Sequence, residues 1–304
     1  MERPYILHLF TPGSQMSPFD VNMAADAGYQ VIAPYTGVTL EGVAALTQDA
    51  IFSRSPKGLA RTAIFIGGRD ALLAADMLEK AKRAMFAPFQ VALMADPSGA
   101  YTTAAAMVAC VEAALREHAG STLAGRRVVV LGGTGPVGRI ACVLAAQAGA
   151  QVALSSRTGI DAAEAAARLT GERFGVTLEG VSGGDRAAVR ASLETADVLL
   201  SCAAAGVQAV GAEDLAFARN LRVAADVNAV PPAGVAGVEV MDRGAPIAGL
   251  NGAVGIGALA IGNVKYQTQQ QLLRRMHEAG TPQVLSFREA FELARQILAA
   301  PAAA

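Results

Sequence analysis

The sequence has few of the residues that build metal sites or disulfide frameworks. Its 304 residues include three cysteines, three histidines and no tryptophan. Cys110, Cys142 and Cys202 lie far apart in segments rich in alanine or valine, without the CxxC spacing of zinc or redox motifs. We therefore expect buried, reduced thiols of the kind found in the cytoplasm, and no bound metal.

Charge of one sign is also scarce. Only 17% of the residues are charged, 25 basic against 26 acidic, and neither sign forms a run. Binding to a nucleic-acid backbone needs a concentrated positive face. Because the sequence has no basic run, we exclude nucleic acid as a partner. The N-terminal sequence MERPYILHLF lacks a charged segment followed by a long apolar stretch. We therefore expect neither a signal peptide nor a membrane span, and a cytoplasmic location.

The chain is rich in apolar residues and glycine. It is 53% hydrophobic and contains 32 glycines, a balance typical of a parallel sheet covered by alanine-rich helices. In the first part, short apolar runs at 5–10, 30–33, 62–66 and 90–94 predict strands, and 70–86 and 102–118 predict helices. Such alternation indicates βαβ units and an α/β fold.

A turn-rich segment at 117–125 separates this part from a second α/β pattern. After it, strands are predicted at 127–131, 151–155, 197–201 and 221–226, and helices at 137–148, 161–174, 263–277 and 287–299. We expect two α/β domains with a cleft between them, one over 1–120 and one over 121–284. The C-terminal helix at 285–300 is expected to pack back on the first domain.

The strongest local motif is a glycine-rich turn between a β-branched strand and an alanine-rich helix. Gly133, Gly135 and Gly138 have the G-x-G-x-x-G spacing of dinucleotide-binding turns. The first permits the turn, the second lets the backbone approach the pyrophosphate, and the third lets the helix pack on the strand. The helix N-terminus attracts the phosphates. The predicted contacts are Gly133, Thr134, Gly135, Pro136, Val137 and Gly138.

The next strand ends in Ser155, Ser156 and Arg157, where an NAD-specific site carries an acidic residue for the ribose 2′-OH. Arg157 can pair with a 2′-phosphate and Ser156 can donate to it. NADP is therefore favoured, with NAD as the weaker alternative. We expect the domain over 121–284 to be a Rossmann-type NADP-binding domain and the domain over 1–120 to be the substrate domain. The competing interpretation of Arg157 is an exposed loop arginine.

Two later strand ends are predicted to line the nicotinamide pocket. Cys202, Ala203 and Ala204 follow one strand, and their small side chains let the backbone approach the cofactor. Asn228 follows the next strand and precedes a Pro-Pro pair. Asn228 is predicted either to contact the cofactor or to cap a rigid turn.

Seven further segments have distinctive sequences. They are MSPFDVNMA (16–24), YTGVTL (35–40), LTQDAIFSR (46–54), FIGG (65–68), DPSGAYTTAAAMVA (96–109), DVNAVPPAGVAGV (226–238) and GIGALAIGNVKYQTQ (255–269). Together they resemble the methylene-tetrahydromethanopterin dehydrogenases of methylotrophic bacteria, a family similar in architecture to the folate-linked methylene dehydrogenases. The resemblance covers nearly the whole chain.

The resemblance implies oxidation of methylene-tetrahydromethanopterin to the methenyl cation with reduction of NADP⁺, and a homo-oligomer. Neighbouring nitrogens stabilise the developing cation at the C1 carbon, so catalysis consists mainly of positioning that carbon against nicotinamide C4 and excluding water. Methylene-tetrahydrofolate is a possible second substrate. Other functions left open are a shikimate- or amino-acid-dehydrogenase-like oxidoreductase, which needs a proton donor, and a non-enzymatic nucleotide sensor.

Substrate contacts are predicted at Phe19, Asp20, Thr102, Thr103 and Lys265, with Asp20 and Lys265 also as catalytic candidates. Phe19 would pack on the pterin ring and Asp20 would bind its nitrogens, although Asp20 also fits the third position of a helix that starts at Ser17-Pro18. The two threonines also fit a helix cap. Lys265, predicted near the start of its helix, would polarise or orient the pterin, or else lie on the surface.

Overall fold

The computed structural model describes residues 3–300, which form two compact units. The first unit ends at Thr102 and also takes in Tyr266–Leu293, and the second spans Thr103–Lys265 and begins again at Ala294. Three helices, α5 (Ala100–Ala119), α10 (Ala258–Glu278) and α11 (Phe287–Ala299), run from one unit into the other.

This division differs from the expected ranges 1–120 and 121–284, because the chain changes unit inside helices and not in loops. The second part of α10 belongs with the first unit: Leu273 is buried, and its carbonyl accepts a hydrogen bond from the Tyr29 hydroxyl at 3.3 Å. The start of the C-terminal helix also packs there, with the Phe287 ring 5.4 Å from that of Tyr101.

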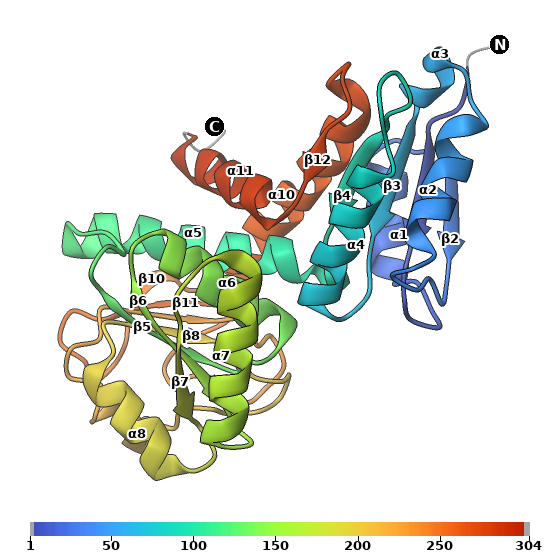
Figure 1. Cartoon of the computed structure of the whole chain (residues 1–304). Helices are drawn as coiled ribbons and strands as arrows, with labels where there is room; N and C mark the ends of the chain where they lie inside the picture. The colour runs from blue at the N-terminus through green and yellow to red at the C-terminus, as the bar shows by residue number, and fades with distance from the viewer. Residues whose placement is uncertain (1–2, 301–304) are drawn as a thin grey trace. The chain divides into compact units, whose positions relative to one another are not determined.

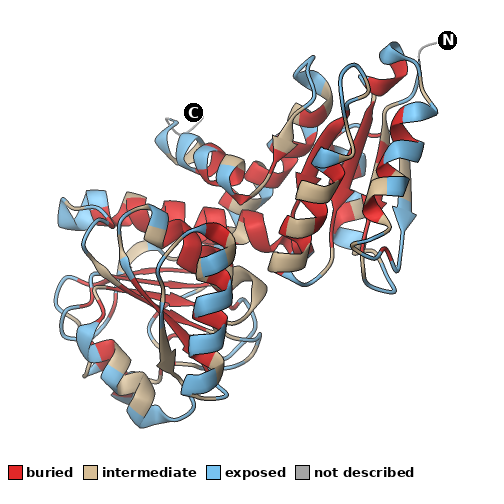
Figure 2. Ribbon diagram, viewed as in Figure 1, coloured by how far each residue is buried: buried red, intermediate tan, exposed pale blue. Residues whose placement is uncertain are grey.

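The first unit is built on a five-stranded parallel sheet. Its strands are β1 (Ile6–Phe10), β2 (Val31–Tyr35), β3 (Thr62–Ile66), β4 (Ala92–Ala95) and β12 (Val284–Leu285), in the order β12-β4-β3-β1-β2 (Figure 1). Its helices are α1 (Pro18–Asp26), α2 (Val43–Phe52), α3 (Pro56–Leu59) and α4 (Ala71–Arg83), besides the parts of α5, α10 and α11 (Phe287–Ala299) that belong to it. β3 and β4 are buried along their whole length, as strands covered on both faces are (Figure 2).

The order of these strands reverses between β1 and β3. The chain goes from β1 to β2 at one edge, then returns to β3 on the other side of β1 and continues outward to β4. In open α/β sheets, ligands bind at the carboxyl ends of the strands at such a switch point. The topology therefore points to the loops after β1 and β3.

The second unit has a seven-stranded sheet in the order β10-β11-β9-β8-β5-β6-β7 (Figure 1). The strands are β5 (Arg127–Leu131), β6 (Gln151–Ser156), β7 (Glu179–Ser182), β8 (Val198–Ser201), β9 (Val223–Asp226), β10 (Arg243–Pro246) and β11 (Val254–Ile256). Only β10 pairs antiparallel. The helices that lie wholly within this unit are α6 (Pro136–Gln147), α7 (Ile160–Phe174), α8 (Arg186–Thr195) and α9 (Ala212–Leu215).

The core of this unit follows from the β-branched strand β5. Val129 and Leu131 pack into a fully apolar cluster with Leu193 of α8 and Leu199 of β8. Helices α6 and α7 contact each other and cover β5 and β6. β5 lies between β6 and β8, which makes its carboxyl end the switch point of this sheet.

Most predicted elements are present with shifted ends, and four strands and three helices were not predicted. The missed strands β7, β10, β11 and β12 are short, with two to four residues each, and the missed helices are α3, α8 and α9. The predicted start of α10 at residue 263 was wrong, because the helix begins at Ala258 and Gly262 lies inside it. Glycine lowers helix propensity, but it does not end a helix whose neighbouring residues are buried by tertiary packing.

One helical stretch, Pro97–Ala119, is long and apolar enough to cross a membrane by length and composition alone. Within its most apolar window, 83% of the residues are buried inside the protein. Burial of that extent is typical of a core helix.

Candidate active site

A cavity of about 570 Å³ lies at the switch point of the second unit. The loops after β5, β6, β7 and β8 all contribute to it. Of the predicted cofactor contacts, Thr134, Gly135, Pro136, Ser155, Arg157, Cys202, Ala203 and Ala204 line this cavity. Four strand ends that are remote in sequence thus converge where a Rossmann domain binds its dinucleotide.

The glycine-rich turn uses a glycine that the sequence motif did not include. Gly132 has the positive φ of 69°, whereas the turn had been attributed to Gly133. A Cβ on Gly133 would instead lie 2.7 Å from the Leu154 side chain, so this glycine permits close packing of the turn on β6. Gly135 is the N-cap of α6, and the nearest atom to a Cβ there would be Gly132 O at 3.4 Å. The approach to the N-terminus of α6 is therefore open.

The packing role predicted for Gly138 is confirmed. A Cβ at this position would lie 2.7 Å from Gly133 Cα, so only glycine lets α6 meet the turn. Arg139 of α6 links the turn to α7: its Nε donates to Thr134 O at 3.0 Å, and its Nη1 donates to Thr170 Oγ1 at 2.6 Å. Val137 and Gly138 belong to the first turn of α6, whose N–H groups lack intrahelical acceptors.

The end of β6 presents an arginine to the cavity. Arg157 is exposed and has no hydrogen bond or ion pair within the part of the chain that the structure describes. Ser155 is buried and lines the cavity beneath Gly183, whereas Ser156 shares a hydrogen bond of 2.9 Å with the Thr158 hydroxyl. An unpaired guanidinium at this strand end is suited to bind an anion.

The loop after β7 completes this end of the cavity and was not predicted. Gly183, Gly184, Asp185 and Arg186 line it, and the Gly183 N–H donates to Ser156 O at 2.8 Å. Because β7 is short and half-exposed, no apolar periodicity marked it in the sequence. A glycine pair before an Asp N-cap is the only signal that this loop carries.

The end of β8 contributes small residues and a neutral thiol. Burial, and to a lesser degree the charge of Asp226, raises the pKa of Cys202 to about 12. Asn228 does not line the cavity: its Oδ1 accepts from the Gly206 and Val230 N–H groups, and its Nδ2 donates to Pro232 O. Its hydrogen bonds thus fit the second of the two predicted roles, a residue that caps a rigid turn.

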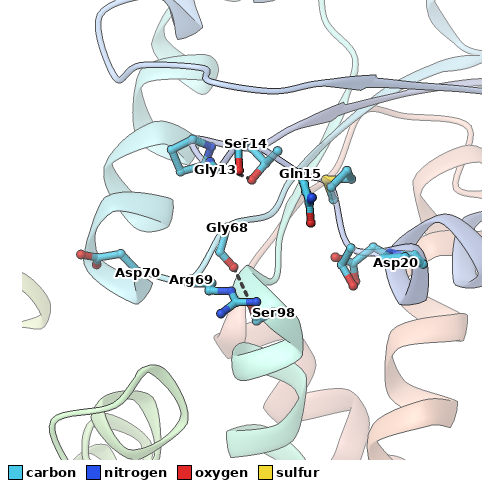
Figure 3. A pocket seen from close by; sticks show the side chains of 13 residues that line it. Gly13, Ser14, Gln15, Asp20, Gly68, Arg69, Asp70 and Ser98 are labelled. Carbon is cyan, nitrogen blue, oxygen red and sulfur yellow. Dashed lines mark hydrogen bonds between the residues drawn. The ribbon is translucent and has the colours of Figure 1, made fainter.

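A second cavity, of about 660 Å³, lies in the first unit at the switch point between β1 and β3. It is lined by the loops after β1, β3 and β4 together with the start of α1 (Figure 3). Gln15, Asp20, Arg69, Asp70 and Ser98 give it a polar wall with two carboxylates and one guanidinium (Figure 3). Such a set can bind a polar ring through both donors and acceptors.

Asp20 is the predicted substrate residue that this cavity contains. It is the third residue of α1, after Ser17 at the N-cap and Pro18, as the sequence indicated, although Ser17 makes no side-chain cap bond. Asp20 is buried, and its Oδ1 accepts from Gln269 Nε2 of α10 at 3.3 Å. Gln269 is fully buried and was not predicted, because it is 249 residues away in sequence.

The turn before α5 is strained next to this cavity. Ser98 has a φ of 52°, the left-handed region that side chains other than glycine rarely adopt, and its hydroxyl donates to Gly68 O at 2.7 Å. Asp96, which the sequence did not single out, accepts from the Tyr101 and Thr102 N–H groups and from the Thr102 hydroxyl. A capping role for Thr102 is therefore wrong: it lies inside α5, and Asp96 caps the helix.

The remaining predicted substrate residues do not line this cavity. Phe19 is 47% exposed on α1, and Thr103 is half-buried in α5. Lys265 is half-buried in the third turn of α10 and not near the helix start, where the sequence had placed it.

The sequence was compared with known proteins. Residues 18–98 match the family model for the N-terminal part of methylene-tetrahydromethanopterin dehydrogenase. The NAD(P)-dependent methylenetetrahydromethanopterin dehydrogenase of Methylorubrum extorquens is 50% identical over 96% of this chain and 98% of its own length. A bifunctional protein, MdtA, of the same organism is 33% identical over the same shares.

Among solved structures, an ornithine carbamoyltransferase from Pyrococcus furiosus covers 92% of this chain and 86% of its own, with a TM-score of 0.50 and 12% identity. At that identity the likeness concerns the fold alone. The full-length identity to the curated relatives confirms the resemblance drawn from the seven sequence segments. The chain belongs to the methylenetetrahydromethanopterin dehydrogenase family.

Proposed function

We propose that this protein is an NAD(P)-dependent methylenetetrahydromethanopterin dehydrogenase, which oxidises the methylene carrier to the methenyl form and reduces NADP⁺. The observation that carries the proposal is the 50% identity, over 96% of the chain, to a relative of that name. The cavity at the switch point of the second unit supports it, because it has the form of a dinucleotide site.

The residues of this cavity fit the cofactor. The open approach at Gly135 and the N-terminus of α6 suit a pyrophosphate, and the unpaired Arg157 suits a 2′-phosphate. The small residues after β8 leave room for the nicotinamide end, and the neutral Cys202 thiol adds no charge there. When bound, NADP⁺ supplies the acceptor for the hydride. NAD⁺ is the weaker alternative.

For the carrier we propose the polar cavity of the first unit, with Asp20 as the acceptor for the N–H groups of the pterin ring. Gln269 holds one carboxylate oxygen of Asp20, which fixes its orientation. The proposed substrate contacts also include Phe19, Thr103 and Lys265. Thr102 does not contact the substrate in this proposal; its hydroxyl donates to the Asp96 carboxylate at the start of α5. Lys265 is the proposed residue that polarises or orients the ring.

The hydride-transfer step requires no general acid or base. The two nitrogens that flank the C1 carbon stabilise the positive charge left when the hydride departs, so no proton has to move at that step. The protein contributes orientation and exclusion of water. A shikimate-dehydrogenase-like reaction needs a proton donor at the hydride acceptor, and a nucleotide sensor needs no second polar cavity. We further propose a cytoplasmic homo-oligomer.

The test is a spectrophotometric assay of NADPH formation with methylene-tetrahydromethanopterin and, separately, methylene-tetrahydrofolate. We expect NADPH with the methanopterin carrier. Tight NADP⁺ binding without NADPH formation from either carrier would contradict the proposed reaction and favour the sensor. Turnover with the folate carrier alone would reassign the substrate.

A further inference from the structure

The end of the dinucleotide cavity that faces β6 and β7 has two arginines, which differ in their surroundings. Arg157 has no ion pair among residues 3–300. Arg186, the first residue of α8, lines the same cavity. The loops that carry them meet, because a Cβ on Gly184 would lie 3.3 Å from Arg157 O. A 2′-phosphate bound at Arg157 would therefore share its cavity with a second guanidinium.

Arg186 is held by carboxylates from α9. Its Nη2 lies 2.6 Å from Glu213 Oε1 and 3.0 Å from Asp214 Oδ2. Hydrogen bonds to Glu213 first and to Asp214 second raise the pKa of Arg186, so it stays charged. Because the same nitrogen serves both carboxylates, the guanidinium is turned toward α9.

The two carboxylates differ in how firmly they are bound themselves. Asp214 is buried, and it also accepts from Arg190 Nε at 2.7 Å and from the Gly211 N–H at 3.0 Å. Glu213 is 67% exposed, and its other contact is Arg190 Nη2 at 3.5 Å. Asp214 is thus part of the structure that anchors α8 to α9, whereas Glu213 can be changed without opening the core.

The charges that line the cavity also cancel. They are Arg157, Asp185, Arg186 and Asp214, two of each sign. A 2′-phosphate brings about two negative charges at neutral pH and is favoured by free guanidinium groups, whereas the 2′-hydroxyl of NAD has no such requirement. The Arg157 guanidinium is therefore free to bind the phosphate, whereas the Arg186 guanidinium is already paired with the carboxylates of α9.

We propose that Glu213 determines cofactor specificity: by pairing with Arg186, it withholds the second guanidinium from the 2′-phosphate and keeps the preference for NADP over NAD moderate. The proposal rests on the proposed function, since it assumes that the cavity binds these dinucleotides. Glu213 acts through Arg186 and does not itself touch the cofactor.

The experiment measures dissociation constants of NADP⁺ and NAD⁺ by titration calorimetry for the wild type and Glu213→Gln. We expect NADP⁺ to bind about two- to fivefold more tightly to the variant, the size of effect that one exposed ion pair produces, and NAD⁺ to bind as before. With Arg186→Gln also present, the gain at position 213 should disappear. The thermal transition of each variant shows that it is folded.

Glu172→Gln is the matched control. Glu172 is 62% exposed and paired with Arg168 at 3.2 Å on α7, and it does not line the cavity, so the same charge is removed from a similar pair. An unchanged ratio of the two affinities in Glu213→Gln, an equal gain for both cofactors, or the same gain in Glu172→Gln would overturn the proposal. A wild type that binds neither dinucleotide would instead overturn the proposed function.

Discussion

Substitution of Gly135 by valine tests whether the pyrophosphate lies at the N-terminus of α6. Gly135 has a φ of −73° and a ψ of 167°, an extended conformation that valine adopts readily. The nearest atom to its Cβ would be 3.4 Å away, an ordinary contact distance. The fold therefore has room for the Cβ, and we expect the two methyl groups to occupy the space proposed for the pyrophosphate.

The expected loss of affinity follows from the hydrogen bonds that are blocked. The Gly135 N–H already donates to Gly132 O, so the donors at stake are the free N–H groups of the first turn of α6. A hydrogen bond to a charged group contributes about 1.5–3 kcal/mol. Loss of two such bonds weakens NADP⁺ binding by about 3–6 kcal/mol, or roughly 10²- to 10⁴-fold. Stability should fall by only about 1 kcal/mol, because valine is a poorer N-cap than glycine.

Titration calorimetry with NADP⁺ and a thermal unfolding curve provide the two readouts. The control is Gly42→Val, because Gly42 is the N-cap of α2, has its nearest side-chain neighbour at 3.6 Å and lines neither cavity. It should bind NADP⁺ with wild-type affinity. If folded Gly135→Val binds NADP⁺ within about threefold of the wild type, a deficit of 0.7 kcal/mol or so, the pyrophosphate lies elsewhere.

Three other changes probe neighbouring parts of the second unit. Arg157→Ala should raise the dissociation constant of NADP⁺ by about tenfold or more and leave that of NAD⁺ nearly unchanged, because only the 2′-phosphate needs its charge; equal losses would remove Arg157 from that subsite. Gly138→Ala should lower the free energy of unfolding in urea by about 1–3 kcal/mol, since its methyl group meets backbone that cannot move aside; wild-type stability would contradict the packing role. The Cys202 pKa of about 12 lies above that of an unfolded thiol. Its contribution to stability is therefore complete below about pH 8.5 and declines up to about pH 12. Unfolding curves should show a smaller decline in Cys202→Ala, and rapid alkylation of the native thiol at pH 8 would contradict its raised pKa.

The glycine turn and the long elements of the second unit could be predicted because local rules govern them. Strand β5 is a β-branched run, and α6 begins at Gly135-Pro136, so strand, turn and helix are all visible in the sequence. The assignment of the positive φ to Gly133 failed for a local reason as well. Two consecutive glycines, Gly132 and Gly133, can both take that conformation, and packing on β6 decides between them.

Contacts between distant segments could not be predicted from one sequence. The bond from Gln269 to Asp20 joins helices at opposite ends of the chain, and the pairing of Arg186 with Glu213 depends on how α8 meets α9. The division of the chain inside α5, α10 and α11 is of the same kind, because no composition shift marks a boundary within a helix. Tertiary packing settles each of these.

Both cavities lie at the switch point of their sheet, yet only the ligand of the second-unit cavity could be predicted from a local sequence motif. A pyrophosphate is bound by backbone N–H groups, which constrains the chain to glycines at fixed spacing around Gly135. In the first unit the polar wall is made of side chains such as Gln15 and Arg69, on the loops after β1 and β3, and Asp20, in the first turn of α1. Such side chains obey no common spacing, since each loop length is free to vary. For this reason the cofactor class followed from one turn, whereas the substrate class required a resemblance along the whole chain.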